Sequence, residues 1–122
     1  MDENIQNWDT PIAWITHLAN PTIHFFRGRL SITLENLDTG ENWQLQVREA
    51  VGYKVTQHFG MRRLANTFVV KESLWISALH REPMLIPGQL DGVRHYLIET
   101  MSENIEILTK EEPSIFKTDT PR

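Results

Sequence analysis

The sequence contains no cysteine, which excludes a disulfide framework, a catalytic thiolate and every zinc site built on cysteine. No apolar run approaches the roughly 20 residues that cross a bilayer. Residues 1–7 are polar and acidic and lack the basic start and apolar core of a signal peptide. Glycine-rich phosphate loops are missing as well, because the six glycines are scattered singly. We therefore expect a cytoplasmic protein with no membrane association and no cofactor.

Positive charge is also scarce, since the formal net charge is −4. A nucleic-acid-binding protein usually carries a basic stripe, so we expect no nucleic-acid partner. The arginines that could form a basic patch are Arg27, Arg29, Arg62 and Arg63. Mild acidity favours instead a basic protein partner, because opposite charge speeds the encounter of two proteins.

The length of 122 residues and the hydrophobic fraction of 40% are those of one globular domain. We place this domain at residues 1–116. The tail carries Pro113 and Pro121 among charged and hydroxyl residues. We therefore expect residues 117–122 to fray.

Two short helices are predicted. Pro11–Leu18 follows Thr10, a residue suited to capping, and ends before Asn20-Pro21. Leu74–His80 follows the capping residue Ser73 and precedes Pro83. Trp14 and Leu18 in the first helix, and Leu74, Trp75 and Leu79 in the second, would face the core.

Alternation of apolar and polar side chains predicts the strands. The clearest pair is 30–34 and 43–47, joined by a turn at Asp38-Thr39-Gly40. Further strands are expected at 51–55, 67–70, 94–100 and 105–109. These elements predict an α+β fold, with an antiparallel sheet of about five strands covered by a single layer of two short helices.

No catalytic or metal-binding motif is present. The five histidines form no paired metal signature, and no serine lies in a Gly-x-Ser-x-Gly motif. Ser77 and His80 could meet on the second helix, but no third group is identifiable to orient the histidine. If the protein were a small enzyme using histidine and carboxylate, His95 and Glu99 would be the first candidates, because they share one face of a strand.

The C-terminal half carries a resemblance. A short helix Ser73-Leu-Trp-Ile-Ser-Ala-Leu-His80 precedes the strands Arg94-His-Tyr-Leu-Ile-Glu-Thr100 and Ile105-Glu-Ile-Leu108. Over Thr67–Phe116 this order resembles small uncharacterised bacterial α+β proteins, some of which look like immunity proteins of polymorphic or contact-dependent toxin systems. The resemblance implies a protein that neutralises one toxin by binding it, without catalysis.

The leading hypothesis is therefore a non-enzymatic inhibitor that binds a basic toxin domain through acidic side chains. The carboxylates that we assign to this surface are Glu35, Asp38, Glu41, Glu99, Glu103 and Glu106. The non-enzymatic alternative is a structural or oligomeric accessory domain, such as a homodimer that pairs through an exposed sheet edge.

Overall fold

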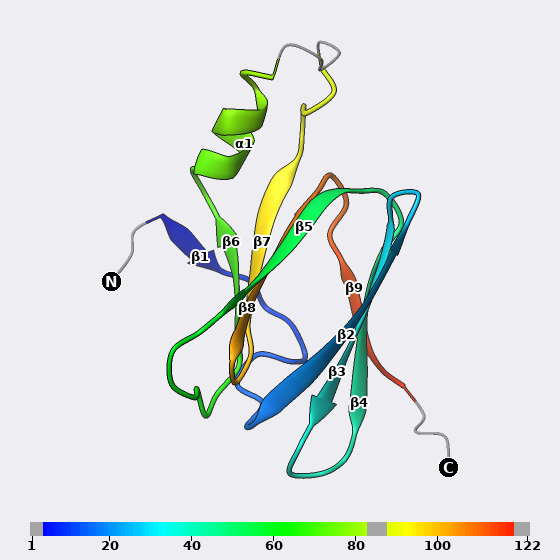
Figure 1. The fold of residues 1–122 in the computed structure, drawn as a ribbon, viewed down its shortest axis with the longest axis vertical. Coiled ribbons are helices and arrows are strands. Elements are labelled where there is room, and N and C mark those ends of the chain that lie inside the picture. The colour runs from blue at the N-terminus through cyan, green and yellow to red at the C-terminus, as the bar shows by residue number, and fades with distance from the viewer. Residues whose placement is uncertain (1–3, 83–87, 119–122) are drawn as a thin grey trace.

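A computed structural model describes residues 4–82 and 88–118 of the chain. These residues form nine strands and one short helix, arranged as two antiparallel sheets (Figure 1). The expected α+β fold with two helices on a single sheet is therefore wrong, and the protein is mostly β. Alternation along a strand shows which side chains face inward, but it does not show to which sheet the strand belongs.

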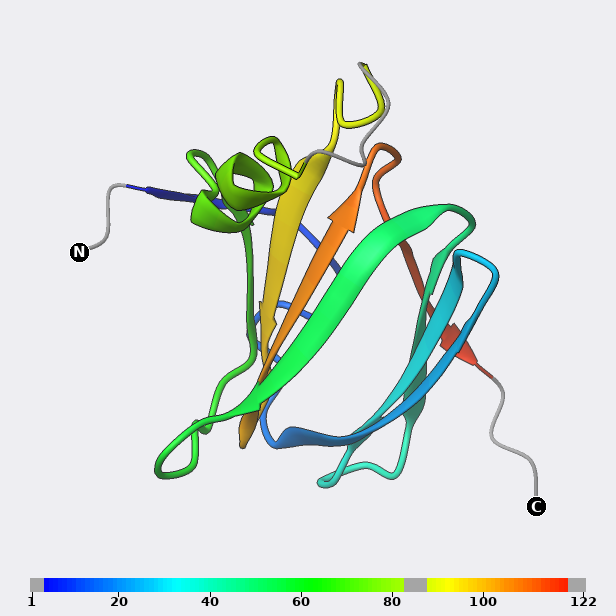
Figure 2. The same ribbon diagram turned by 45° about the horizontal axis from the view of Figure 1, so that its top comes forward.

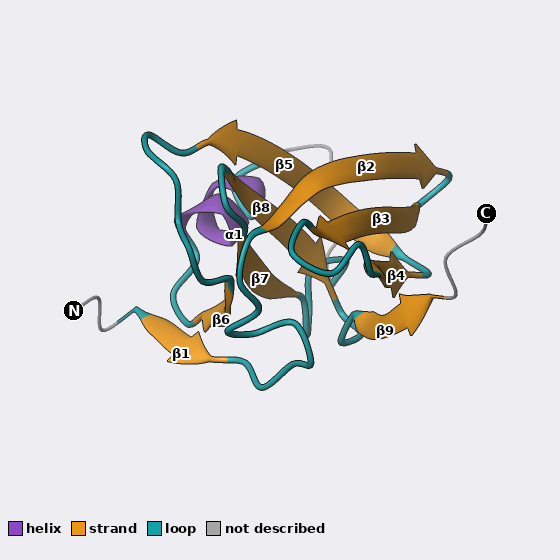
Figure 3. Cartoon of the chain, turned by 90° about the horizontal axis from the view of Figure 1, so that it is seen from below, coloured by secondary structure: helices purple, strands orange, loops and turns teal. Residues whose placement is uncertain are grey.

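The two sheets have different strand orders. Sheet 1 has the order β1-β6-β7-β8-β5 and sheet 2 the order β2-β3-β4-β9. The strands of sheet 1 are β1 (Ile5–Asn7), β6 (Asn66–Val70), β7 (Arg94–Glu99), β8 (Glu103–Thr109) and β5 (Ala50–Gln57). Those of sheet 2 are β2 (Leu18–Phe26), β3 (Arg29–Asn36), β4 (Asn42–Val47) and β9 (Ser114–Thr118). Figure 3 shows the two layers from below, with β5 and β2 side by side at one margin, where Phe25 and Tyr53 bring their ring centroids to 5.2 Å.

The core lies between the sheets, because each strand turns its apolar side chains toward the opposite layer. The residues that sheet 2 contributes include Leu30, Ile32, Leu34, Leu45 and Val47, and those of sheet 1 include Tyr96, Ile98, Ile105 and Ile107. Burying one such isoleucine or leucine contributes about 1.5–3 kcal/mol. The predicted pairing of 30–34 with 43–47 is confirmed, with Leu30 opposite Val47 and Leu34 opposite Trp43.

The predicted helix at Pro11–Leu18 is not present. Residues 11–14 form turns, and β2 begins at Leu18. The backbone of Trp14 has a φ of 71° and that of His17 a φ of 53°, both in the left-handed region that a right-handed helix excludes. The Asn20-Pro21 pair, read as a helix stop, lies where the pairing of β2 with β3 shifts register. Because β2 is an edge strand, it tolerates a proline there.

The helix predicted after Ser73 is confirmed as α1 (Leu74–Leu79), and the Ser73 hydroxyl accepts a hydrogen bond from the backbone N–H of Ile76 at 3.0 Å. Its predicted burial is wrong, because no residue of α1 is buried and Leu74 is exposed. The helix lies against the outer face of sheet 1 (Figure 2). There Trp75 comes so close to Gly52 that a Cβ at this glycine would be 3.4 Å from the indole ring. Pro83 and part of the expected loop at 84–92 lie outside the described residues.

The connections between strands gather at two ends of the molecule. At the lower end of Figure 1 lie residues 8–17, the β3–β4 turn, the β5–β6 loop and the β7–β8 turn. At the upper end lie the β2–β3 turn, the β4–β5 connection, α1 and the β8–β9 connection. Lys117 and Thr118 of the expected frayed tail pair with β4, and residues 119–122 lie outside the described residues.

Candidate functional site

The loops of the lower end are joined to one another by backbone hydrogen bonds. His17 donates its N–H to the carbonyl of Arg63 at 2.8 Å, and Leu37 donates to the carbonyl of His17 at 3.0 Å. Arg62 donates to the carbonyl of Met101 at 2.8 Å. Segments that are far apart in the sequence therefore form one supported surface rather than independent loops.

This surface exposes five large apolar side chains. We call it the lower-end surface and define it by Trp14, Leu37, Phe59, Met61 and Leu64. Phe59 is fully exposed, Met61 is 73% exposed and Trp14 is 66% exposed. Isolated exposed apolar residues are ordinary, but these five come from loops at one end of the molecule, and tryptophan, methionine and phenylalanine are enriched at protein interfaces.

Trp14 lies in a strained backbone conformation at this surface. Its φ of 71° costs a non-glycine residue roughly 1–2 kcal/mol. The conformation is held by a hydrogen bond of 2.7 Å from the N–H of Trp14 to the carbonyl of Ala65. Because the indole is exposed, packing of its ring does not offset the free-energy cost of this backbone conformation. Retained strain of this kind is typical of residues that act in binding or catalysis.

Sequence reasoning missed Trp14, because we expected it to face the core from a helix. Of the other tryptophans, Trp8 is buried, Trp43 packs partly buried against the core, and Trp75 lies half-buried on the outer face of sheet 1. The only local signal was Pro11, which starts turns as well as helices.

The predicted acidic residue Asp38 lies beside the lower-end surface, in the β3–β4 turn. Its carboxylate accepts hydrogen bonds from the Thr16 hydroxyl at 2.6 Å and from Nδ1 of His17 at 2.9 Å. These hydrogen bonds, that from Thr16 first, lower the pKa of Asp38. The carboxylate therefore stays ionised and also fixes the strained segment to the turn.

Two further predicted carboxylates lie in β3 and in the connection from β3 to β4. Glu41 forms an ion pair with Lys117 at 3.1 Å, and Glu35 accepts a hydrogen bond from the Asn20 amide at 3.2 Å. Both are therefore partnered within the protein. Exposed pairs of this kind contribute little to stability, so the partners could be exchanged for those of a bound protein.

Glu99 and Glu103 lie at the lower end of sheet 1, around the guanidinium of Arg62. Nε of Arg62 is 3.9 Å from Glu99, and the guanidinium donates to the carbonyls of Thr100 at 2.8 Å and Glu103 at 3.1 Å, and to the side chain of Asn104. The Glu103 carboxylate accepts from the Thr100 hydroxyl at 2.7 Å. Arg62 thus fastens the β5–β6 loop to the β7–β8 turn.

Glu106 lies apart from the other five, on the outer face of sheet 1. It accepts a hydrogen bond from Nε2 of His95 at 2.7 Å, and its second oxygen is 4.0 Å from Nζ of Lys54. The carboxylate partner of His95 is therefore Glu106, whereas Glu99 is the neighbour of Arg62. Alternation along the strands could have predicted this pair. Tyr96 and Ile107 face the core, so their neighbours His95 and Glu106 both point to the outer face of sheet 1.

The second ring nitrogen of His95 extends this pair to the helix. Nδ1 lies 2.7 Å from the hydroxyl of Ser73, so that glutamate, histidine and serine form a continuous chain of hydrogen bonds. The edge of Trp75 packs on the imidazole at a centroid distance of 5.6 Å, and Lys54 lies over the indole. Burial lowers the pKa of His95, although the hydrogen bond that Nε2 donates to Glu106 opposes the shift. The imidazole is therefore neutral at neutral pH.

Ser73 and His95 line a cavity of about 740 Å³ between α1 and the start of β7. Ser77, His80 and Arg94 line the same cavity. In the described part of the chain no hydrogen bond joins Ser77 to His80, the pair suggested by their helical spacing.

Metal sites and membrane spans give no further candidate. Within residues 4–82 and 88–118, no group of three or more histidine, aspartate or glutamate side chains is placed to hold a metal ion. No helix in these ranges is long and apolar enough to span a membrane. Comparison of the chain with protein-family models, with curated proteins and with solved structures gives no match.

Proposed function

We propose that the protein is a non-enzymatic protein-binding domain, acting as an immunity-type inhibitor that neutralises a bacterial toxin by direct contact. The observation that carries the proposal is Trp14, an exposed indole held on a strained backbone by a short hydrogen bond. Tryptophan is among the residues that most often dominate binding energy at protein interfaces. A rigid, pre-ordered indole also loses little entropy when a partner covers it.

The chemistry of the partner follows from what surrounds Trp14. The apolar side chains of the lower-end surface call for an apolar pocket on the partner. The carboxylates of Asp38, Glu99 and Glu103 border this surface, so basic side chains on the partner would face them. Because these carboxylates already have partners inside the protein, their main contribution is to the rate and specificity of encounter.

The decisive experiment compares three tagged proteins in affinity capture from lysate of the source strain. They are the wild type, Trp14→Ala, and the control Leu74→Ala, which removes an even more exposed apolar side chain from α1 at the other end of the molecule. We expect a stoichiometric partner with the wild type and the control. The partner should be toxic when expressed alone, and co-expression of the wild type should restore growth.

The affinity of each variant for the purified partner then measures how much binding energy Trp14 contributes. Truncation of a hot-spot residue costs about 2 kcal/mol or more, so Trp14→Ala should weaken binding by roughly 30-fold or more. The control should lie within about twofold of the wild type, because α1 is outside the lower-end surface. A captured toxin whose affinity is unchanged by Trp14→Ala would disprove the assignment of the surface. Capture of no toxic partner would disprove the immunity function.

A second candidate function is an esterase-type hydrolase, and the chain of hydrogen bonds from Glu106 through His95 to Ser73 favours it. In that reaction the Ser73 oxygen attacks an ester carbonyl while its proton passes to Nδ1 of His95. The histidine then returns the proton to the departing alcohol, and water hydrolyses the acyl-serine. Wild-type protein would release a stoichiometric burst of p-nitrophenol from p-nitrophenyl acetate, and Ser73→Ala would abolish it while Ser77→Ala would not. Equal rates in all three proteins would exclude this candidate.

A further inference from the structure

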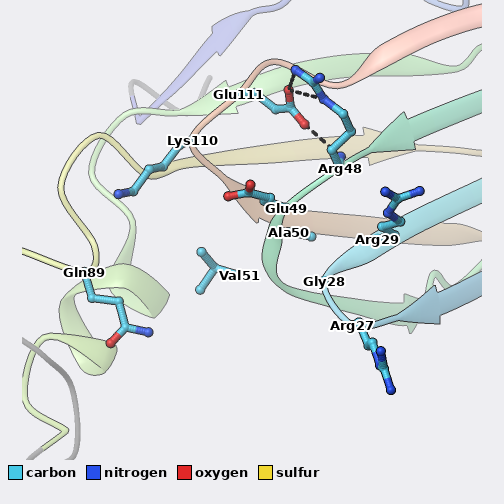
Figure 4. A pocket seen from close by; sticks show the side chains of 10 residues that line it. All are labelled: Arg27, Gly28, Arg29, Arg48, Glu49, Ala50, Val51, Gln89, Lys110 and Glu111. Carbon is cyan, nitrogen blue, oxygen red and sulfur yellow. Dashed lines mark hydrogen bonds and ion pairs between the residues drawn. The ribbon is translucent and has the colours of Figure 1, made fainter.

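The upper end of the molecule holds a cleft between three connections of the two sheets. Its walls are the β2–β3 turn, the β4–β5 connection and the β8–β9 connection, Gln89 from the segment before β7 also lines it, and its volume is about 940 Å³ (Figure 4). The N–H of Ala50 donates to the carbonyl of Gly28 at 2.7 Å, and the N–H of Arg48 donates to the Glu111 carboxylate at 2.7 Å. The three walls are thereby bonded to one another before any ligand arrives.

The cleft concentrates positive charge in an acidic protein. Four cationic side chains line it (Arg27, Arg29, Arg48 and Lys110) against two carboxylates, Glu49 and Glu111. The local excess is thus two positive charges, whereas the whole chain has a formal net charge of −4. Like charges gathered on a fixed frame repel one another, and an anion in the cleft would remove this repulsion.

These cations are not consumed by internal ion pairs. Within the described ranges, Arg48 alone of these four is paired, with the Glu111 carboxylate at 3.1 Å. Arg27 lies over the ring of Phe26, and among the described residues neither Arg29 nor Lys110 has a carboxylate within ion-pair distance. A guanidinium group without a carboxylate partner offers several N–H donors in a forked arrangement that fits phosphate oxygens.

The backbone of Arg27 gives a second, independent observation. Arg27 and Gly28 form the two-residue turn between β2 and β3 with φ values of 52° and 82°. Such turns favour asparagine, aspartate or glycine at the first position, because a larger residue there is strained. A long side chain at this position is strained where asparagine, aspartate or glycine would not be, and the Arg27 guanidinium lies over the ring of Phe26.

We propose that the upper-end cleft binds a small anion with two or more phosphate groups, of a size between tripolyphosphate and a nucleoside triphosphate. The volume lies within the range of small-ligand sites, and its cations are spread over separate walls, which suits several charges rather than one. The Glu49 carboxylate lies between Lys110 and Arg29 in the view of Figure 4, so it limits the affinity. The connections that line the cleft lie at the opposite end of the molecule from the loops of the lower-end surface (Figure 1). Ligand binding is therefore independent of the proposed protein partner.

The test is a titration of the full chain with inorganic tripolyphosphate, followed by amide chemical shifts and by calorimetry. We expect saturable shifts at residues 27–29, 48–50 and 110, without shifts in the lower-end surface. Arg29→Gln and Lys110→Gln should each weaken binding by about fivefold or more, because each removes a charge-assisted contact. Glu49→Gln should strengthen binding by a similar factor, and affinity should fall as salt is raised.

Lys71→Gln is the matched control, since it makes the same change of charge at an exposed lysine outside the cleft. It should change affinity by less than about twofold, because it is not among the contacts of the ligand. Thermal unfolding of every variant without ligand would show that the fold is intact. The proposal is overturned if Lys71→Gln weakens binding as much as Arg29→Gln, if no saturable shift occurs, or if a short oligonucleotide binds more tightly than tripolyphosphate.

Discussion

Replacing Ser73 by alanine removes two hydrogen bonds at once, and their joint cost can be worked out from the structure. The hydroxyl accepts from the N–H of Ile76, and loss of such a helix cap costs about 1 kcal/mol. The same hydroxyl satisfies Nδ1 of the buried His95, and a buried polar atom left without a partner costs about 1–3 kcal/mol. We therefore expect Ser73→Ala to lower the free energy of unfolding by about 2–4 kcal/mol.

Urea and thermal unfolding followed by circular dichroism measure this change. For a chain of this size, 1 kcal/mol corresponds to a shift of about 3–5 °C in the melting temperature, so Ser73→Ala should melt about 6–20 °C lower. Ser77→Ala, on the exposed part of the same helix, should stay within about 0.5 kcal/mol of the wild type. Ser73→Thr keeps the hydroxyl and should recover most of the loss.

A double-mutant cycle with His95→Phe separates the cap from the link to the sheet. If the hydroxyl holds α1 through the imidazole, Ser73→Ala will cost less in the His95→Phe background, with a coupling of about 1–2 kcal/mol. Strict additivity of the two changes, or a cost for Ser73→Ala no larger than that of Ser77→Ala, would refute the reasoning.

Three further outcomes follow from other contacts. Burial lowers the pKa of His95 below its ordinary value of 6.5, so the unfolded chain takes up a proton at a higher pH than the folded protein does. The free energy of unfolding should therefore be highest above pH 6.5 and decrease as the pH falls below it. If the urea midpoint of His95→Gln decreased with pH as steeply as that of the wild type, this assignment would be contradicted. Ile107→Ala opens a cavity at a fully buried position and should cost about 2–5 kcal/mol in chemical unfolding, whereas Ile107→Val should cost about 1 kcal/mol. Arg62→Lys loses the forked contacts to the Thr100 and Glu103 carbonyls and should cost about 1–3 kcal/mol; hydrogen exchange of the N–H of Met101 no faster than in the wild type would argue against that role.

The strands that sequence reasoning found are those with a strict two-residue alternation. The pair 30–34 and 43–47 has one, and the structure confirms both the pairing and the turn at Asp38-Thr39-Gly40. The same reasoning located β5, β6, β7 and β8, and Ser73 marked the start of α1. Local chemistry was sufficient for these elements because each is defined by its own side chains.

The elements that it missed are held by their pairing partners rather than marked by their own alternation. Strand β2 contains Asn20-Pro21, which interrupts the alternation, and it is held by pairing with β3. Strand β9 lies in a polar C-terminal segment and is held by pairing with β4. The division into two sheets follows from strand order, since β5 pairs with β8 rather than with β4. Such long-range choices leave no mark on the local pattern.

The candidate sites show the same limit. The six predicted carboxylates come from elements of both sheets, and no single surface contains them all. The chain from Ser73 to Glu106 joins three elements whose register sets the contact. The strain at Trp14 depends on a carbonyl 51 positions along the chain, that of Ala65, and a reading of neighbouring residues does not reach so far.

The left-handed backbone at Trp14 has a consequence for laboratory evolution. A library randomised at this position and selected only for heat resistance should enrich glycine or asparagine, because these residues occupy that conformation at little cost. A library selected only for inhibition of the partner should return tryptophan. The difference between the two enriched sequences would report directly how much stability the chain gives up for recognition.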